Sequence, residues 1–325
     1  MAVKSPALRR AIAAHLRQFR GMDVDPEQII IGAGTELLYT LIIQLLGREK
    51  CYAVEDPGYS KIAEIYRSHQ VNLRQVGLDE KGLSTRLLRR QEADIVHLSP
   101  SHHYPTGIVM PIGRRQELLR WAEEPEGRWI LEDDYDSEFR HSGEPIPAML
   151  GMVPDAPVVY LGTFSKTLFP ALRIGFMVMP PALADAAQDA IGALLRGGHR
   201  AEQRALASFI EKGHYARHLA AMRRLYRKRQ QQLREALAQE ITVPCDVLGG
   251  GGGMHLTVAM EGVNDRTLAQ QARQFQLAPA ALSHFYLDPQ RARSGLVLGY
   301  GNTSASRYLP ALRTLNRLIA QHRRA

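Results

Sequence analysis

Hydrophobic residues recur along the whole chain at spacings that predict alternating helices and buried strands. Between Pro6 and Gly21 the chain predicts an amphipathic helix. Its apolar residues are three or four positions apart: Leu8, Ile12, Leu16 and Phe19. The stretch from Leu37 to Leu46 is apolar on nearly every side, which is typical of a buried helix. Alternation of short apolar runs with such helices as far as Pro180 predicts a mainly parallel sheet covered on both faces.

The predicted elements divide the chain into two parts. Strands of the sheet are expected at Glu27–Ile31, Tyr52–Val54, Val71–Val76, Asp94–Leu98, Arg128–Leu131, Pro157–Leu161 and Arg173–Met179. Helices are expected over Ala182–Leu195, Ala201–Ile210 and a basic stretch to about Ala238, and then over Asp265–Phe275 and Ser304–Ile319. Two late strands are expected near His255–Ala259 and Leu296–Tyr300, and the glycine run Gly249–Gly253 is expected to be a flexible loop. We therefore predict a large α/β domain over 1–215 and a smaller α+β domain over 216–325.

Composition narrows the class of protein. The 325 residues are 45% hydrophobic, which is enough for a substantial core. The chain has no apolar run of the roughly 18 residues that a transmembrane helix needs, and its first residues do not resemble a secretion signal. Cys51 and Cys245 are too few for a disulfide scaffold or a zinc site. We expect a globular cytoplasmic protein.

The net charge of +8 permits attraction to nucleic acid or to anionic ligands. Basic residues cluster between Arg217 and Arg234, where apolar residues also recur at helical spacing. This pattern is typical of a long amphipathic helix with a solvated charged face. A DNA-reading helix is the alternative, although neither a helix-turn-helix pair nor zinc-ligand spacing accompanies it.

Three predicted strands end in unusually polar segments: Ser99–Gly107, Glu132–Asp136 and Thr163–Lys166. Ligands of open parallel sheets lie outside the carboxyl ends of the strands, so these segments indicate a site. Lys166 would be a nucleophile able to form a Schiff base if it were desolvated near a cation such as Arg173. Together with Thr163 and Ser165, Arg173 offers donors suited to a phosphate. The alternative for Lys166 is an ordinary solvated loop lysine.

The acidic segment admits several interpretations. Asp133, Asp134 and Asp136 could hold a divalent metal, or one of them could pair with a protonated ring nitrogen while Tyr135 donates to a nearby oxygen. Asp136 could also cap a helix. Elsewhere, Gly34-Thr35-Glu36 begins the buried helix, where free N–H groups and the helix dipole favour an anion.

The run Gly162–Phe176 resembles the cofactor-lysine motif of fold-type I pyridoxal phosphate (PLP) proteins. Within these, the chain looks like the MocR branch of the GntR-type bacterial regulators, whose effector domain is similar to aminotransferases. Further segments support the resemblance and cover nearly the whole chain: Glu55–Tyr59, Ser99–Gly107, Glu132–Arg140 and His214–Leu219. It implies a large domain with a mostly parallel sheet, a smaller α+β C-terminal domain and a homodimer.

The resemblance also implies roles for individual residues. Lys166 would form the internal aldimine with PLP, and Asp133 would pair with the pyridinium nitrogen so that the ring acts as an electron sink. The family pattern aligns this role with Asp133 rather than Asp134. Tyr135 would bond the ring's phenolic oxygen and Tyr59 would stack on the ring. The phosphate would be surrounded by Gly34, Thr35, Glu36, Thr163, Ser165 and Arg173.

Three departures from the family pattern affect the predicted function. Relatives begin with a winged-helix DNA-binding domain and a linker, and we expect this chain to lack them. Val297 stands where aminotransferases carry an arginine for the substrate carboxylate, and it cannot make that contact. Arg293 or Lys61 could substitute. His103 stands where relatives often carry Gln.

We therefore predict a PLP-binding, aminotransferase-like sensor domain of a MocR-type transcriptional regulator. Its effector would be a small amino compound or PLP itself, DNA would be contacted only through a winged-helix domain, and no membrane is involved. The alternative is a free-standing class I/II PLP-dependent aminotransferase acting on an amino acid or amine. There Lys166 would also shuttle the proton.

Overall fold

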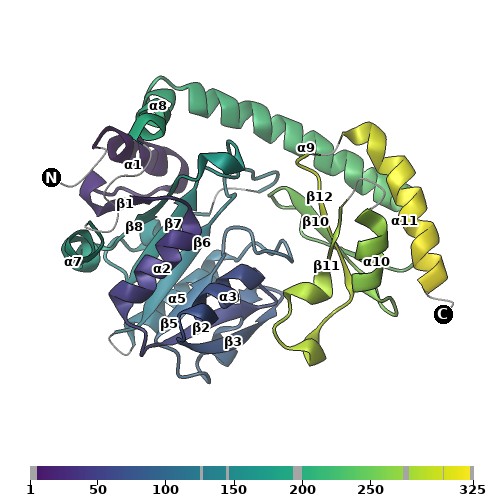
Figure 1. Cartoon of the computed structure of the whole chain (residues 1–325), viewed down its shortest axis with the longest axis horizontal. Coiled ribbons are helices and arrows are strands. Elements are labelled where there is room, and N and C mark those ends of the chain that lie inside the picture. Colours follow the sequence, from purple (N-terminus) through teal and green to yellow (C-terminus); the bar gives the residue numbers. More distant parts are fainter. Residues whose placement is uncertain are drawn as a thin grey trace.

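The computed structural model of the chain contains two sheets joined by one long helix, α9 (His214–Glu240; Figure 1). The structure describes residues 6–124, 127–143, 146–192, 200–273, 278–302 and 304–322. The fold class predicted from the sequence, a large mostly parallel sheet with a smaller α+β unit, is confirmed. Among the described helices, none combines the length and the apolar character needed to cross a membrane.

The large sheet has eight strands in the order β1-β8-β7-β6-β5-β2-β3-β4. Their bounds are β1 Ile29–Gly32, β2 Cys51–Asp56, β3 Asn72–Asp79, β4 Gly82–Leu83, β5 Ile95–Leu98, β6 Trp129–Asp134, β7 Val158–Thr163 and β8 Gly175–Val178. The central strands β3, β2, β5, β6 and β7 are parallel, whereas β4, β8 and β1 each pair with their neighbours antiparallel. The carboxyl ends of β5, β6 and β7 therefore lie side by side, as the site hypothesis requires.

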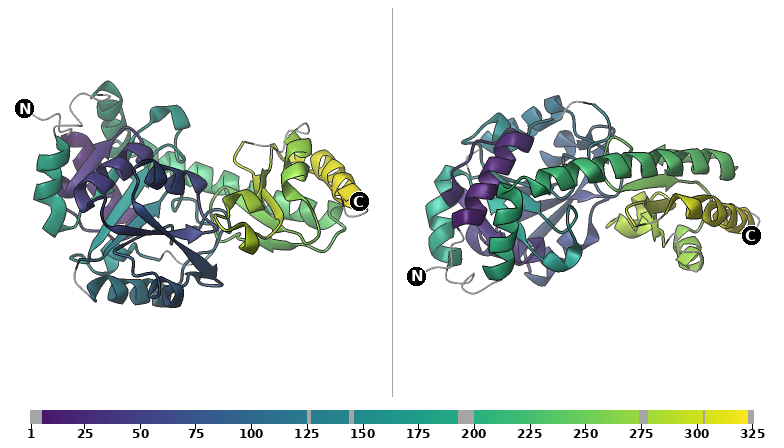
Figure 2. Two further views of the ribbon diagram at one scale, coloured as in Figure 1. Left: turned by 60° about the horizontal axis from the view of Figure 1, so that its bottom comes forward. Right: turned by 90° about the horizontal axis from the view of Figure 1, so that it is seen from above.

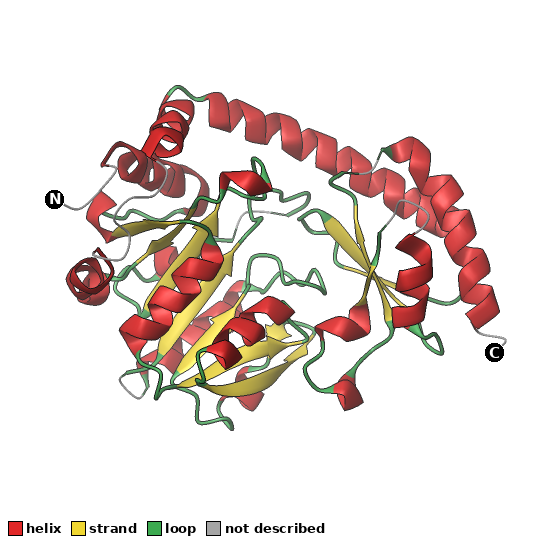
Figure 3. Ribbon diagram, viewed as in Figure 1, coloured by secondary structure: helices red, strands yellow, loops and turns green. Residues whose placement is uncertain are grey.

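Helices cover both faces of this sheet because its strand residues are apolar on both sides (Figure 3). One face packs against α2 (Thr35–Leu46), α3 (Ser60–Ser68) and α7 (Pro181–Gly192). The other packs against α1 (Pro6–Arg20), α5 (Ile112–Glu123), α6 (Met149–Met152) and α8 (Arg200–Glu211), and the short α4 (Thr85–Leu88) lies beside α5. Successive residues of each strand therefore point alternately into the apolar cores on the two faces of the sheet.

The smaller unit is a four-stranded antiparallel sheet in the order β11-β12-β10-β9. Its elements are β9 Asp246–Leu248, β10 His255–Ala259, α10 Asp265–Ala272, β11 Ala280–Ala281, β12 Gly295–Gly299 and α11 Tyr308–His322. The two helices and the second half of α9 close an apolar core over this sheet. The short strands β9 and β11 were absent from the sequence prediction because two or three residues show no periodicity.

Helix α9 bridges the two units (Figure 2). Tyr215 and Leu219 enter the large core, whereas Leu233 and Leu237 enter the small one. Arginines on its flanks donate to backbone carbonyls of nearby loops: Arg223 to Glu138, Arg229 to Gly301 and Arg234 to Gly249. These contacts favour the amphipathic-helix interpretation of the basic stretch over the DNA-reading one.

Several predicted boundaries moved for local reasons. Pro26–Gln28 forms a 3₁₀ turn with a capping box on Asp25, so strand β1 starts only at Ile29. The glycine run was expected to be a flexible loop, but it is docked on the large unit. Gly251 O accepts the His141 N–H at 2.9 Å, and Gly253 N–H donates to Phe139 O at 2.8 Å. The predicted helix ends at Leu195 and Phe275 lie outside the described residues.

Candidate functional site

A cavity of about 320 Å³ lies at the carboxyl ends of β6 and β7, next to the first turn of α2. All ten residues singled out from the sequence line it: Gly34, Thr35, Glu36, Tyr59, Asp133, Tyr135, Thr163, Ser165, Lys166 and Arg173. The structure adds five others to the wall: Tyr39, Ile62, Ser99, Tyr104 and Pro170. The three polar strand ends therefore converge on one cavity.

One end of the cavity is built to attract an anion. Gly34 has a φ of 93°, which residues with a side chain rarely adopt, and a Cβ there would also lie 2.9 Å from the Arg173 guanidinium, so glycine is favoured. Helix α2 begins at Thr35, and the N–H groups of its first turn point toward this end. Arg173, itself in the left-handed conformation with a φ of 49°, is held over the turn.

The anion end also contains a carboxylate. Arg173 Nη2 donates to Glu36 Oε2 at 2.8 Å, and Lys61 Nζ lies 3.4 Å from Glu36 Oε1. Burial raises the pKa of Glu36, but hydrogen bonds from its own backbone and from Arg173 outweigh it and lower that pKa. A bound anion would meet Glu36 as a competitor for Arg173.

Lys166 lies in the tight turn that follows β7. Thr163 Oγ1 accepts the Ser165 N–H at 3.1 Å, and the turn is anchored by two buried residues, Phe164 and Thr167. Thr167 accepts a hydrogen bond from the Tyr215 hydroxyl at 2.9 Å, which ties the turn to α9. Lys166 itself is exposed on the cavity wall. The desolvation invoked to activate it is therefore not supplied by the chain alone, because the cavity mouth is open to water.

The floor of the cavity is a buried chain of hydrogen-bonding groups that ends on Asp133. Asp133 Oδ2 accepts the Tyr39 hydroxyl at 2.6 Å and lies 3.4 Å from His97 Nε2. His97 Nδ1 is 2.7 Å from the Tyr66 hydroxyl, and all these side chains are buried. Sequence reasoning missed Tyr39 and His97. The available signal was the single polar residue, His97, in the otherwise apolar strand β5, whereas Tyr39 is one of several polar residues of α2.

The other two aspartates face elsewhere. Asp134 points to the opposite side of β6, where it accepts from Tyr160 at 2.7 Å and pairs with Arg20 Nε at 2.8 Å. Asp136 pairs with His102, 3.0 Å away. The three carboxylates have three separate partners and two of them face away from the cavity, which weighs against the metal interpretation. No cluster of three potential metal ligands occurs within the part of the chain that the structure describes.

Aromatic rings form the remaining wall. Tyr59 is 45% exposed at the mouth, and its ring meets Tyr104 edge to face at 6.1 Å. The Tyr135 hydroxyl lies 3.2 Å from His102 Nδ1. A planar ring entering between Tyr59 and the floor would meet a hydroxyl on one edge and an aromatic face above.

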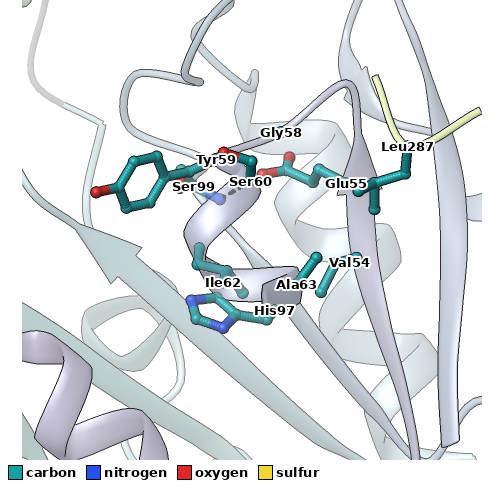
Figure 4. A pocket seen from close by; sticks show the side chains of 10 residues that line it. All are labelled: Val54, Glu55, Gly58, Tyr59, Ser60, Ile62, Ala63, His97, Ser99 and Leu287. Atoms are coloured by element: carbon teal, nitrogen blue, oxygen red, sulfur yellow. Dashed lines mark hydrogen bonds between the residues drawn. The ribbon is translucent and has the colours of Figure 1, made fainter. Parts of the chain in front are cut away.

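Behind this wall lies a pocket of about 20 Å³, room for one water-sized molecule (Figure 4). Glu55 borders it and accepts the Ser99 N–H at 2.9 Å. Burial raises the pKa of Glu55 to about 8, so this carboxyl is largely neutral at pH 7. His103 is buried 3.5 Å from Glu55 and 2.7 Å from Thr106, outside the cavity. Burial lowers the pKa of His103 to about 3.

The described residues of the small unit contribute no cation to the cavity. Val297 is buried in an apolar cluster with Leu282 and Phe285. Arg293 pairs with Asp246 at 3.3 Å, and Lys61 reaches only Glu36 at the rim. Among the described residues that line the cavity, the cations are Lys166 and Arg173.

The fold is that of the aminotransferases. The kynurenine aminotransferase of Pyrococcus horikoshii superposes with a TM-score of 0.88 over 98% of this chain and 81% of its own, at 23% identity. Residues 2–294 match the family "Aminotransferase class I and II", and the chain belongs to that family.

Relatives with a more similar sequence are named as regulators. The chain is 36% identical to the uncharacterized HTH-type transcriptional regulator YhdI of Bacillus subtilis, over 91% of this chain and 63% of YhdI. It is 37% identical to the probable rhizopine catabolism regulatory protein MocR of Rhizobium meliloti, over 91% of this chain and 60% of MocR. The chain therefore spans about 60% of the length of these curated relatives, and it is an aminotransferase-like domain homologous to part of them.

Proposed function

We propose that the chain is a PLP-binding sensor domain of a MocR-type transcriptional regulator. One observation carries this proposal: an amine, a carboxylate and an anion-attracting turn line a single cavity of about 320 Å³. They belong to Lys166, Asp133 and the Gly34–Thr35 turn with Arg173. PLP has the matching features, namely an aldehyde, a ring nitrogen and a phosphate, and proteins of this fold typically bind it.

The floor suits the ring end of the cofactor. Asp133 accepts one short hydrogen bond from Tyr39 and has a second carboxylate oxygen for another donor. A protonated ring nitrogen beside it would form a charge-assisted hydrogen bond in a largely buried place. Tyr39 and His97 would hold the carboxylate in position from behind.

The opposite end suits the phosphate. Backbone N–H groups at the start of α2, the hydroxyls of Thr163 and Ser165 and the Arg173 guanidinium would donate to its oxygens. Glu36 opposes this binding, because its carboxylate forms an ion pair with the Arg173 guanidinium. A phosphate would have to displace it, which would weaken the affinity without preventing binding.

When bound, PLP supplies an electron sink for charge that develops at the carbon next to an amine. Lys166 would hold the cofactor covalently, its nitrogen joining the aldehyde carbon with loss of one water. Tyr135 would donate to the phenolic oxygen and Tyr59 would cover the ring face. In the aminotransferase alternative, the Lys166 amine would also carry the proton at this place.

Sensing is favoured over turnover because the carboxylate-binding arginine of aminotransferases is replaced by Val297, whose side chain is buried among apolar residues. An amino compound would then be retained mainly through its amine. The regulators among the relatives fit this proposal, in which a winged-helix domain contacts DNA. The alternative, an aminotransferase acting on an amino acid or amine, is favoured by the free position of Lys166 on the cavity wall.

The same proposal includes a cytoplasmic homodimer. Leu37, Tyr59 and Phe169 are large, exposed and apolar, and each lies in or beside the segments that form the cavity mouth. A second copy would cover them. We also propose the domain division near residues 215 and 216, at the start of α9.

Spectroscopy of the cofactor-loaded protein tests the proposal and separates its two forms. Titration with PLP should give a saturable yellow complex, and failure to bind PLP would contradict both forms. A panel of amino acids and amines is then added. A sensor should show reversible spectral shifts only, whereas release of a keto acid or aldehyde with conversion to the pyridoxamine form would establish the aminotransferase.

A further inference from the structure

A second, larger cavity lies behind the candidate cofactor cavity and shares no lining residue with it. Its volume is about 480 Å³, within the range of roughly 300–1,000 Å³ that is usual for small-ligand sites. The end of α1, the segment from Asp136 to Gly143, the glycines Gly251–Gly253 and helix α9 form its wall. Both units of the molecule contribute to it.

The wall of this rear cavity is rich in arginine. Five arginines line it, against two carboxylates, Asp136 and Glu138: Arg20, Arg115, Arg140, Arg223 and Arg227. Two of the arginines are neutralised from within the sheet, because Arg20 pairs with Asp134 at 2.8 Å and Arg115 lies 3.5 Å from Glu132.

Three arginines have no carboxylate partner among the described residues, although the Arg223 guanidinium lies over the Phe19 ring, 5.4 Å from its centroid. Arg140 and Arg223 donate only to backbone carbonyls, those of Ser142, Gly143 and Glu138. Arg227 is exposed and makes no described hydrogen bond. Within the described ranges, no carboxylate lies within ion-pair distance of any of the three.

The two carboxylates of the wall are already engaged. Asp136 pairs with His102 at 3.0 Å, and Glu138 lies 3.6 Å from His15 Nε2. Inside the wall, burial lowers the pKa of His141, a hydrogen bond with Gly253 O opposes this, and the charge of Arg227 lowers that pKa further. A concave surface with unpaired guanidinium groups concentrates anions, and guanidinium forks match carboxylate and phosphate oxygens.

We propose that this rear cavity is a second ligand site, which binds a small molecule bearing carboxylate or phosphate groups. Such a ligand would bridge the large unit, through Arg140, and α9, through Arg223 and Arg227. Its wall also touches the first cavity, because His102 lies 3.2 Å from the Tyr135 hydroxyl. A ligand in the rear cavity would therefore affect the candidate cofactor site through a single side chain, His102.

Calorimetric titration with inorganic phosphate and with citrate tests this proposal in the cofactor-free chain. All proteins would carry Arg173→Gln, which takes the guanidinium away from the anion end of the first cavity and weakens binding of the probes there. The test variant adds Arg140→Gln and Arg227→Gln, and the control adds Arg224→Gln, which replaces an exposed arginine of the same helix outside the cavity.

The R173Q protein and its R224Q control should bind at least one probe, and the test variant should bind it roughly tenfold more weakly or worse. Phosphate tests recognition of a phosphate group and citrate tests recognition of carboxylates, and binding of either supports the site. Absence of binding to R173Q, or equal binding by the test variant, would overturn the proposal. If the double replacement unfolds the chain, Arg227→Gln alone gives the same comparison, because that side chain is exposed. None of these results depends on PLP binding.

Discussion

The two faces of strand β6 at its carboxyl end carry the same residue type in opposite settings. Asp133 faces the cavity, where it accepts one hydrogen bond from Tyr39 and has room beside it. Asp134 faces the rear, where Arg20, Tyr160 and Ser137 all contact it. The difference shows that surroundings, and not residue type, separate a carboxylate with room for a ligand beside it from one that is fully engaged within the fold.

The rear face should respond most strongly to substitution. Asp134→Ala would leave the Arg20 guanidinium buried without its partner, since only 9% of that side chain is exposed. We expect a loss of about 3–5 kcal/mol in the free energy of unfolding. Urea denaturation measures it, and a loss below about 1 kcal/mol would show that the pair is not structural.

Substitution of Asp133, on the face of β6 that lines the cavity, should affect PLP binding and not stability. Asp133→Asn keeps an acceptor for Tyr39 but removes the charge that would face a protonated ring nitrogen. We expect roughly 100-fold weaker PLP binding and a change of less than about 1 kcal/mol in stability. Absorbance titration and urea denaturation give the two values. If D133N lost stability as D134A does and kept its PLP affinity, the contrast between the faces would be wrong.

Glu55 provides a pH-dependent test of the cavity's surroundings. Burial raises its pKa from 4.5 to about 8, so the folded state binds the proton more tightly than the unfolded state. Its contribution to stability is therefore fully present below pH 4.5 and is lost as the pH rises toward 8, by up to about 1.4 kcal/mol per pH unit.

Glu55→Gln should remove this slope and keep the Ser99 N–H contact. The variant should thus gain stability relative to the unsubstituted chain between pH 5 and pH 8, as denaturation midpoints would report. Parallel pH profiles for the two proteins would count against a raised pKa.

The smallest effect is expected at the anion end. Glu36→Gln frees Arg173 from its carboxylate partner, and we expect phosphate and PLP to bind up to about fivefold more tightly. Glu64→Gln is the matched control, because Glu64 is exposed on α3 and does not line the cavity. Equal affinities for E36Q and E64Q would show that Glu36 does not compete.

The large sheet and its helices were predictable because the spacing of apolar residues along the chain distinguishes strands from helices. The convergence of three strand ends was predictable too, since parallel strands align their carboxyl ends. The preference for Asp133 over Asp134 came from the family pattern. The alternation of side chains along a strand predicts only that Asp133 and Asp134 point to opposite faces of the sheet. Which of the two faces the cavity depends on Arg20 and Tyr39, which are distant in sequence.

Other features of the site depend on packing that no local pattern encodes. His97 reads as one polar residue in an apolar strand, and only the fold places it 3.4 Å from Asp133. Activation of Lys166 required that it be desolvated, and only the fold shows that the turn carries it, exposed, to the open mouth. The rear cavity also needed the fold, because α1, α9 and the glycine run are far apart along the chain.

The central claim is that Lys166 holds PLP covalently, and one measurement tests it most directly. The PLP-loaded chain is reduced with sodium borohydride, digested and mapped by mass spectrometry, with Lys166→Ala as the control. We expect a single phosphopyridoxyl-modified peptide containing Lys166 and no such modification in the K166A protein. A modified lysine elsewhere, or equal labelling of K166A, would contradict the account.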